Sequence, residues 1–457
     1  MPGQRQQTQA TADRAHGARR LDASETVRVL TSVLLPQVAR GAIVRRPLMS
    51  GLVATLDADR KAADVLREMR ERHGDDPLPL RLAGRRAALV LSEQDVRRLL
   101  EETPEPFSPG GREKTGALAH FQPHGVLVSD HADRPRRRAA NEAALVPGQT
   151  IHPDGDVLAA HADEEALALA LALRGGDELD WSRFSRSFHA MARRVVFGSF
   201  AADDYRMTAL LGELRARANW SYLAPARRAT SDEFLDRVRA AVEHAEPGTL
   251  AARLTSETYP HTERSGDGAG IRPQDQAAHW LFAFDAAAIA AFRSLALLTS
   301  LSPGAHAARE EIEDREGLDL PLLRATVRES VRLWPTTLMV IRESTRRTFW
   351  REEVFEAGTA FLILSSYFHR DPSRLPYADT FEPGIWLDGR AEREPGLVPF
   401  SHGPAACAGI DSVPLMISLF LRALVRGGDL TRVDAGGPLP ASGLPRSLNH
   451  FTLRFSL

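Results

Sequence analysis

The chain has 457 residues, and its 58 lysines and arginines against 60 aspartates and glutamates give a formal net charge of −2. A near-neutral balance provides no global field for nucleic acid, so we expect no nucleic-acid partner. A single cysteine excludes a disulfide framework and a zinc site built from several cysteines. Residues 1–20 are polar and lack the apolar core of a secretory signal, which predicts a disordered tail on a cytoplasmic protein.

Apolar residues at helical spacing dominate the chain. The helices predicted before residue 250 cover 22–40, 58–73, 93–102, 134–146, 156–173, 180–199, 203–219 and 230–245. Pro273 then opens a long helix that we expect to continue up to Pro303. Because this helix is apolar almost all round, it should be a central buried helix about 40 Å long. Asp285 and Arg293 near its middle would be costly in lipid, so we expect no membrane contact.

The second half of the chain adds a small β part. Asp319 is the expected cap of a helix over 320–334, which Pro335 ends. Short β-like pieces follow at 338–344, 348–356 and 359–366, and a last apolar helix covers about 409–426. Because the strands are few and clustered, the sequence predicts a mainly α class with a small β part, with residues 21–457 in a single large domain.

The lone cysteine lies in a loop that reads PFSHGPAACAG over residues 399–409. A helix that starts just after such a loop stabilises a thiolate through its dipole and its exposed N–H groups. Gly403 permits a turn with positive φ, and Gly409 removes a side chain where a flat cofactor must approach. A lone cysteine is otherwise an inert buried hydrophobe. The residues alone therefore leave Cys407 as either a reactive or metal-binding group or part of the core.

This segment resembles the haem-binding signature F-x-x-G-x-x-x-C-x-G of cytochromes P450, with Phe400, Gly403, Cys407 and Gly409 in register. The resemblance is to the soluble bacterial, actinobacterial type, and it implies the P450 fold with its long central helix. It also implies haem b (iron protoporphyrin IX) as cofactor, Cys407 as the axial iron ligand, and Phe400 packed on the cofactor's proximal side. Thiolate ligation favours O–O cleavage at haem iron.

Further motifs in order and spacing extend the resemblance over about residues 280–425. Glu329-Ser330-Val331-Arg332 matches the family's E-x-x-R, which implies that Glu329 and Arg332 form a buried structural lock beneath the haem. Residues 369–372 and 381–386 resemble two further family segments, H/N-R-D-P and F-x-P-E-R-W/F. Arg342 matches the arginine that binds a haem propionate, and the plain alternative is a surface strand residue.

Upstream, residues 129–138 lie where the family has a helix whose side chains hold propionates. By that resemblance His131 or Arg137 could serve. The register stays open here, because this run of arginines is equally typical of a solvated basic face or of a docking patch for an acidic electron donor.

The sequence departs from the family's pattern at three places. Ala405 replaces an arginine two residues before the cysteine, and Ile385 replaces the third member of the lock. The long helix carries Ala287-Ala288-Ile289-Ala290-Ala291 where the family has A-G-x-D/E-T. The acid and alcohol that relay protons are therefore missing, and alanine cannot donate a proton. Asp285 falls about one and a half turns before Ala291, and we do not expect it to take this role.

The resemblance implies a haem-thiolate oxidoreductase that monooxygenates a small apolar, secondary-metabolite substrate. Dioxygen and electrons from a ferredoxin and its ferredoxin reductase would drive the reaction. The expected pocket is apolar and is lined by Phe284, Ala287, Ala288, Leu338 and Met339. Two alternatives stay open: a peroxide-driven or redox-neutral haem-thiolate enzyme, and a degenerate, non-catalytic member that binds haem or another ligand.

Overall fold

The computed structural model describes residues 21–457 apart from 42, 83, 130–131, 221–226 and 256–270. The tail predicted at 1–20 lies outside the described residues. The helices of the first half are α2 (Ala23–Arg28), the π-helical turn η1 (Val29–Leu34), α3 (Leu35–Arg40), α4 (Pro47–Thr55), α5 (Ala58–His73), α6 (Glu93–Glu101), α7 (Arg112–Leu118), α8 (Arg134–Leu145), α9 (Gly155–Leu173), α10 (Trp181–Phe197) and α11 (Tyr205–Ala218). The remaining helices are α12 (Arg228–Glu243), α13 (Leu250–Thr255), α14 (Pro273–Leu298), α15 (Pro303–Asp314), α16 (Pro321–Leu333), α17 (Ser365–His369) and α18 (Ser412–Arg426), with the short 3-10 turns η2 (Ser199–Ala201), η3 (Pro383–Trp386) and η4 (Gly403–Ala405).

The strands are few and short, which confirms the predicted mainly α class with a small β part. Within the described residues, the largest sheet has the order β1-β2-β8-β5-β3, built from β1 (Leu78–Leu82), β2 (Arg85–Leu89), β8 (Ala360–Leu364), β5 (Met339–Ser344) and β3 (Phe107–Ser108). Its β2–β8 pair is parallel and its other pairs are antiparallel. A second sheet joins β4 (Leu179–Asp180), β10 (Arg454–Ser456) and β9 (Thr431–Arg432), and a hairpin joins β6 (Thr348–Phe349) to β7 (Val354–Phe355).

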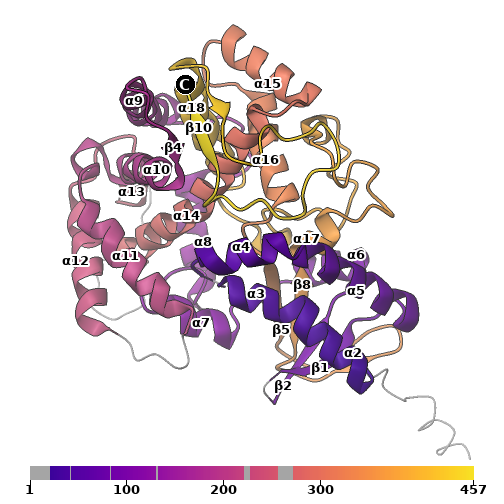
Figure 1. Ribbon diagram of the computed structural model, residues 1–457. Coiled ribbons are helices and arrows are strands. Elements are labelled where there is room, and N and C mark those ends of the chain that lie inside the picture. The colour runs from indigo at the N-terminus through magenta and orange to yellow at the C-terminus, as the bar shows by residue number, and fades with distance from the viewer. Residues whose placement is uncertain (1–20, 42, 83, 130–131, 221–226, 256–270) are drawn as a thin grey trace, which may run out of the picture.

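The helices pack in a large lobe, and the main sheet lies with α2, α3, α5 and α6 at the other end of the molecule (Figure 1). Two large apolar cores follow this division. One core surrounds α14 and takes side chains from α9, α10, α16 and α18. The other lies between the main sheet and the N-terminal helices, where Leu66, Leu89 and Phe361 are fully or almost fully buried.

The long helix α14 is the centre of the helical lobe, as predicted. Among the described helices, α14 is the one that is long and apolar enough to cross a membrane. However, 72% of its most apolar stretch is buried inside the protein. It contacts α10, α12 and α16, and its 26 residues span about 39 Å.

Two predicted boundaries are wrong. α14 ends at Leu298, and Pro303 is the first residue of α15. The Ser302 hydroxyl caps α15 by accepting the N–H of Ala305. Proline suits this position because its missing N–H would have had no helical partner. Asp319 does not cap α16.

The N-terminus of α16 is satisfied from a distance instead. The carboxylate of Glu311, on α15, accepts the backbone N–H groups of Leu322 and Leu323 at 3.0 and 2.8 Å. Asp319 forms an ion pair with Arg324.

Candidate functional site

The cysteine loop is held in one conformation by its own backbone. The N–H of Cys407 donates to the carbonyl of Phe400 at 2.8 Å, and the N–H of Ala406 donates to that of Gly403 at 2.9 Å. Gly403 has a φ of +67°, and a Cβ added there would lie 2.3 Å from the carbonyl oxygen of Leu100. The positive φ predicted at Gly403 is therefore confirmed, and no other residue fits this turn.

Gly409 is required by the packing of the chain itself. A Cβ at this position would lie 2.7 Å from a methyl group of Val413, in the first turn of α18. The cofactor approach that we expected to explain this glycine stays a prediction.

The sulfur of Cys407 is accessible but strongly desolvated. The side chain is exposed, while burial of its surroundings raises the pKa of the thiol above the ordinary value. The backbone N–H of Gly409 and the charge of Arg138 lower this pKa by smaller amounts. Desolvation outweighs these two effects, and the helix start that we expected to stabilise a thiolate is not at Cys407, because α18 begins at Ser412. A sulfur that is accessible but surrounded by protein atoms is suited to bind a metal ion, because the charge of the ion would deprotonate the thiol.

Three cations, Arg342, Lys114 and Arg134, gather around the cysteine loop. Arg342, on β5, is 3% exposed and donates to the hydroxyls of Thr103 and Ser401 at 3.0 and 3.1 Å, the latter within the loop. Lys114 donates to the carbonyl of Pro109, and Arg134 to that of Val126. Within the described part of the chain, none of these three cations forms an ion pair with a carboxylate.

The three cations repel one another. Burial, followed by the charges of Arg342 and Arg134, lowers the pKa of Lys114 to about 7. Burial and the charge of Arg134 lower the pKa of Arg342 to about 10. His279, on α14, lies near this cluster, since burial and then the charges of Lys114 and Arg138 lower its pKa to about 4. Together Arg342, Lys114 and Arg134 form a positive site that no carboxylate of the described residues neutralises.

These residues fit haem b. Buried cations are stable when anions neutralise them, and the two propionates of haem would supply the missing negative charges. The cysteine loop lies beside the cations, because Arg342 bonds to Ser401 and Arg138 donates to the carbonyl of Ala406, next to Cys407. A flat cofactor with one metal and two carboxylates matches this arrangement, because the sulfur would bind the metal and the cations would bind the carboxylates.

The two propionate ligands predicted on the arginine-rich segment have different outcomes. His131 lies outside the described residues. Arg137 is 4% exposed, donates to the Ser129 hydroxyl and forms an ion pair with Asp133 at 2.7 Å. Its Nε has no partner among the described residues, so its role toward a propionate stays a prediction.

The sequence interpretation missed Arg134, Arg138 and Lys114. Arg134 and Arg138 are one turn apart on α8, and this i, i+4 spacing was the available signal for a shared face. Lys114 carried no signal, because only the folded chain brings it to Arg342.

The predicted lock is present and fully buried. Glu329 and Arg332 are both 0% exposed, and their two bonds measure 2.6 and 2.7 Å. Arg332 also donates to main-chain carbonyls, namely those of His369, Tyr377, Ala378 and Thr380. The expected third arginine is absent, and Ile385 is buried. The indole N–H of Trp386 instead donates to Glu329 at 3.0 Å.

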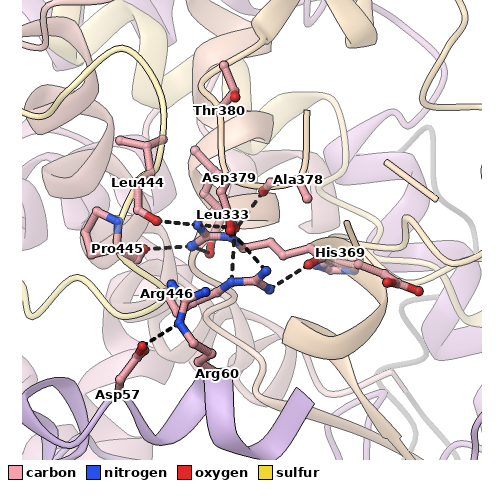
Figure 2. A network of polar contacts seen from close by, with 12 residues as sticks. Asp57, Arg60, Leu333, His369, Ala378, Asp379, Thr380, Leu444, Pro445 and Arg446 are labelled. Carbon is pink, nitrogen blue, oxygen red and sulfur yellow. Dashed lines mark hydrogen bonds and ion pairs between the residues drawn. The ribbon is translucent and has the colours of Figure 1, made fainter. Parts of the chain in front are cut away.

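A second arginine network surrounds Asp379 (Figure 2). It lies next to the lock, because Arg332 and Arg370 both donate to the carbonyl of Ala378. Arg370 forms an ion pair with Asp379 at 2.7 Å and donates to the carbonyls of Leu444 and Pro445. Arg446 pairs with the same Asp379 at 3.0 Å. The network therefore ties residues 369–372, which matched a family segment, to the C-terminal part of the chain.

The middle of α14 is apolar where the family has its acid and alcohol. Ala287, Ala288, Ala290 and Ala291 are all buried. Asp285 forms an ion pair with Arg215 of α11, and His189 of α10 lies 3.9 Å away. This carboxylate is thus occupied by neighbouring helices, in line with the expectation that it takes no relay role.

The five predicted pocket residues fall in two environments. Phe284, Ala287 and Ala288 are buried in the core around α14. Leu338 and Met339 are half-buried at the start of β5. Their joint role in a substrate pocket stays a prediction.

Known structures share this architecture. A retinoic acid-bound cyanobacterial CYP120A1 matches with a TM-score of 0.66 and 17% identity, over 85% of this chain and 93% of that one. A zebrafish cytochrome P450 solved with progesterone matches with a TM-score of 0.66 and 16% identity, over 86% of this chain and 99% of that one.

Sequence comparisons agree with the structural ones. Residues 305–435 match the cytochrome P450 family model. Cyclooctatin synthase of Streptomyces melanosporofaciens is 26% identical over 74% of this chain and 79% of its own length. Sterol 26-hydroxylase of rat is 29% identical, but the match spans only 23% of that enzyme's length. With the P450 fold, the cysteine signature and the buried E-x-x-R pair, the chain belongs to the cytochrome P450 family, whose members bind haem b.

Proposed function

We propose that the chain is a haem-thiolate monooxygenase of a small apolar substrate, with Cys407 as the axial ligand. The observation that carries this proposal is an accessible sulfur beside three cations that have no carboxylate partner among the described residues. Haem bound there would supply the oxidising chemistry on dioxygen.

The residues around the cofactor would position it and exclude water. Cys407 would bind the iron, and Arg342, Arg134 and Lys114 would hold the propionates by charge-assisted hydrogen bonds. Arg137 is a further propionate ligand in this proposal. The buried alanines of α14 would keep the reaction space apolar without offering a proton donor. Protons would then come from water or from a hydroxyl of the substrate.

The substrate and the partners are inferred from the relatives and from the composition. Cyclooctatin synthase and cyclooctat-9-en-7-ol 5-monooxygenase of Streptomyces melanosporofaciens are both relatives, the latter 30% identical over 40% of this chain. They favour a secondary metabolite as substrate, held among Phe284, Ala287, Ala288, Leu338 and Met339. We also propose a cytoplasmic location, with electrons from a ferredoxin and its reductase.

The test is the absorption spectrum of the reduced protein under carbon monoxide. We expect the red-shifted band of a thiolate-bound haem in the purified protein and its loss in Cys407→Ala. Product formation with dioxygen, a ferredoxin and its reductase should disappear in the same variant. Turnover that survives in Cys407→Ala would refute the assignment.

A second candidate function is peroxide-driven or redox-neutral chemistry at the same haem. The observation that favours it is the pair Ala290 and Ala291, which cannot deliver protons. Turnover with hydrogen peroxide and none with dioxygen plus ferredoxin would select it. Purified, folded protein that takes up no haem would leave only a degenerate, non-catalytic role.

A further inference from the structure

Two arginines from distant parts of the chain meet at the loop that leads into β5. Arg293, on α14, donates to the carbonyl of Trp334 at 2.9 Å. Arg45, which lies between α3 and α4, donates to the carbonyl of Thr336 at 2.5 Å. Their acceptors are two residues apart, so the two guanidinium groups are neighbours. This loop runs directly into Leu338 and Met339, two of the proposed pocket residues.

No carboxylate neutralises either arginine in the part of the chain that the structure describes. Their other acceptors are also main-chain carbonyls: Leu448 accepts from Arg293 at 2.9 and 3.1 Å, and Gly41 accepts from Arg45. Both arginines are therefore bonded to neutral oxygen atoms alone.

The two acids whose charges act on this pair, Asp59 and Asp285, already have ion-pair partners. Asp59 accepts two hydrogen bonds from Arg40, at 2.6 and 2.8 Å, and Asp285 is paired with Arg215. Four guanidinium groups thus face two carboxylates, which leaves an excess of two positive charges. Burial is costly for an unpaired charge, and such an excess is expected where an anion completes the site.

The two guanidinium groups keep the accessibility and the donors that an anion needs. Both side chains are half-buried rather than fully buried. Burial and then the charge of Arg45 lower the pKa of Arg293 to about 9. Burial and then the charge of Arg40 lower the pKa of Arg45 to about 10. A guanidinium has five N–H donors. Arg293 uses three of them in the bonds above and Arg45 uses two, so free donors remain on both.

We propose that Arg45 and Arg293 bind a carboxylate of the substrate, so that the substrate class is apolar carboxylic acids. This inference rests on the proposed function, since it places the acid head beside the entrance to β5 and the apolar body toward α14. Two guanidinium groups match the two oxygens of a carboxylate in charge and geometry. The site is separate from the cations near Cys407. Arg45 and Arg293 contact Gly41, Trp334, Thr336 and Leu448, whereas Arg342 contacts Thr103 and Ser401.

The experiment compares head groups on one apolar chain. Isothermal titration calorimetry on the haem-loaded protein would measure the dissociation constants of dodecanoate, 1-dodecanol and dodecyl phosphate. We expect dodecanoate to bind about ten- to a hundredfold more tightly than the alcohol, because one or two charge-assisted hydrogen bonds increase the affinity by about this factor. Arg45→Gln and Arg293→Gln should each lose most of this preference. The matched control is Arg46→Gln, because Arg46 stacks on Trp220 and donates to Ala39.

The outcomes separate this inference from the proposed function. Equal affinity for acid and alcohol, no saturable binding of dodecanoate, or tighter binding of dodecyl phosphate would each overturn the carboxylate assignment. Persistence of the preference in both glutamine variants would do the same, and Arg45→Gln decides the matter if Arg293→Gln does not fold. The carbon monoxide spectrum of the same samples tests the proposed function independently. A normal thiolate band without a preference for the acid would refute the carboxylate assignment and leave the haem-thiolate function in place.

Discussion

Replacing Glu329 with glutamine tests how strongly the buried lock holds the molecule together. The carboxylate of Glu329 accepts four hydrogen bonds: two from Arg332, one from the backbone N–H of Glu382 at 2.9 Å and one from Trp386. In Glu329→Gln one oxygen becomes an NH2 group, which would face N–H donors instead of accepting from them. The change also leaves the charge of Arg332 without its counter-ion at a position that is 0% exposed.

The expected cost is large because both partners are buried. Breaking one side of a buried ion pair costs about 3–5 kcal/mol, against about 5–15 kcal/mol for the whole stability of a protein domain. The carbonyls that also accept from Arg332 stay in place, so we expect the lower part of this range, about 3 kcal/mol. We propose that the pair is structural and performs no chemistry, so the loss should appear in stability before it appears in the spectrum.

The assay is urea unfolding of the haem-loaded protein, followed by tryptophan fluorescence. Glu233→Gln is the matched control, since Glu233 pairs with Arg206 at 2.7 Å but the two side chains are 40% and 49% exposed. An exposed pair contributes about 1 kcal/mol or less. A loss in Glu329→Gln no larger than that of the control would refute the idea that this pair locks the fold.

Three further changes test other parts of the structure. Gly403→Ala places a Cβ against the Leu100 carbonyl at positive φ. It should lower the free energy of unfolding by about 2 kcal/mol or more and lower the haem content measured by the carbon monoxide spectrum. Unchanged haem content and stability would contradict the tight turn. Burial, helped by Arg332, lowers the pKa of His369 to about 3, below the ordinary value of the unfolded chain. The unfolded state then binds the extra proton between about pH 6.5 and 3, and stability falls as the pH drops through that window. His369→Gln should remove about 2 kcal/mol of the loss between pH 7.5 and 5, as urea unfolding at the two pH values would reveal, and an unaltered slope would count against it. Ala291→Thr should raise the fraction of consumed electrons that appears in product if the proton relay is missing, and no change would mean that water or another group already serves.

Some parts of the fold could be predicted because their signal is local. The strands β5 and β8 were predicted at 338–344 and 359–366, where apolar residues with β-branched members run together. The strands β1 and β2 were not predicted, because LPLRL and RRAAL contain proline and arginine and no β-branched residue. They are strands because β2 pairs with β8, far along the chain, and β1 pairs with β2.

The site shows the same division between local and long-range information. Cys407, Gly403, Glu329 and Arg332 each lie in a short motif, so their places could be predicted. Trp386 as a partner of Glu329 could not, because the sequence indicated only that Ile385 replaces the expected arginine.

Both proposed binding regions, the one near Cys407 and the one at Arg45 and Arg293, contain arginines that bond to neutral oxygen atoms. Arg138 shows that an arginine near the cysteine loop can pair with an acid, because it forms an ion pair with Glu142 one turn away. Among the described residues, Arg342 and Arg293 bond only to neutral oxygens. A chain with 60 acidic residues has no shortage of carboxylates, so positive charge left unpaired in its interior is a property of those places. A buried cation without an acid raises the free energy of the empty protein and lowers that of the complex with an anion. The affinity for the haem propionates and for an acidic substrate would then come from charge that folding alone leaves uncompensated.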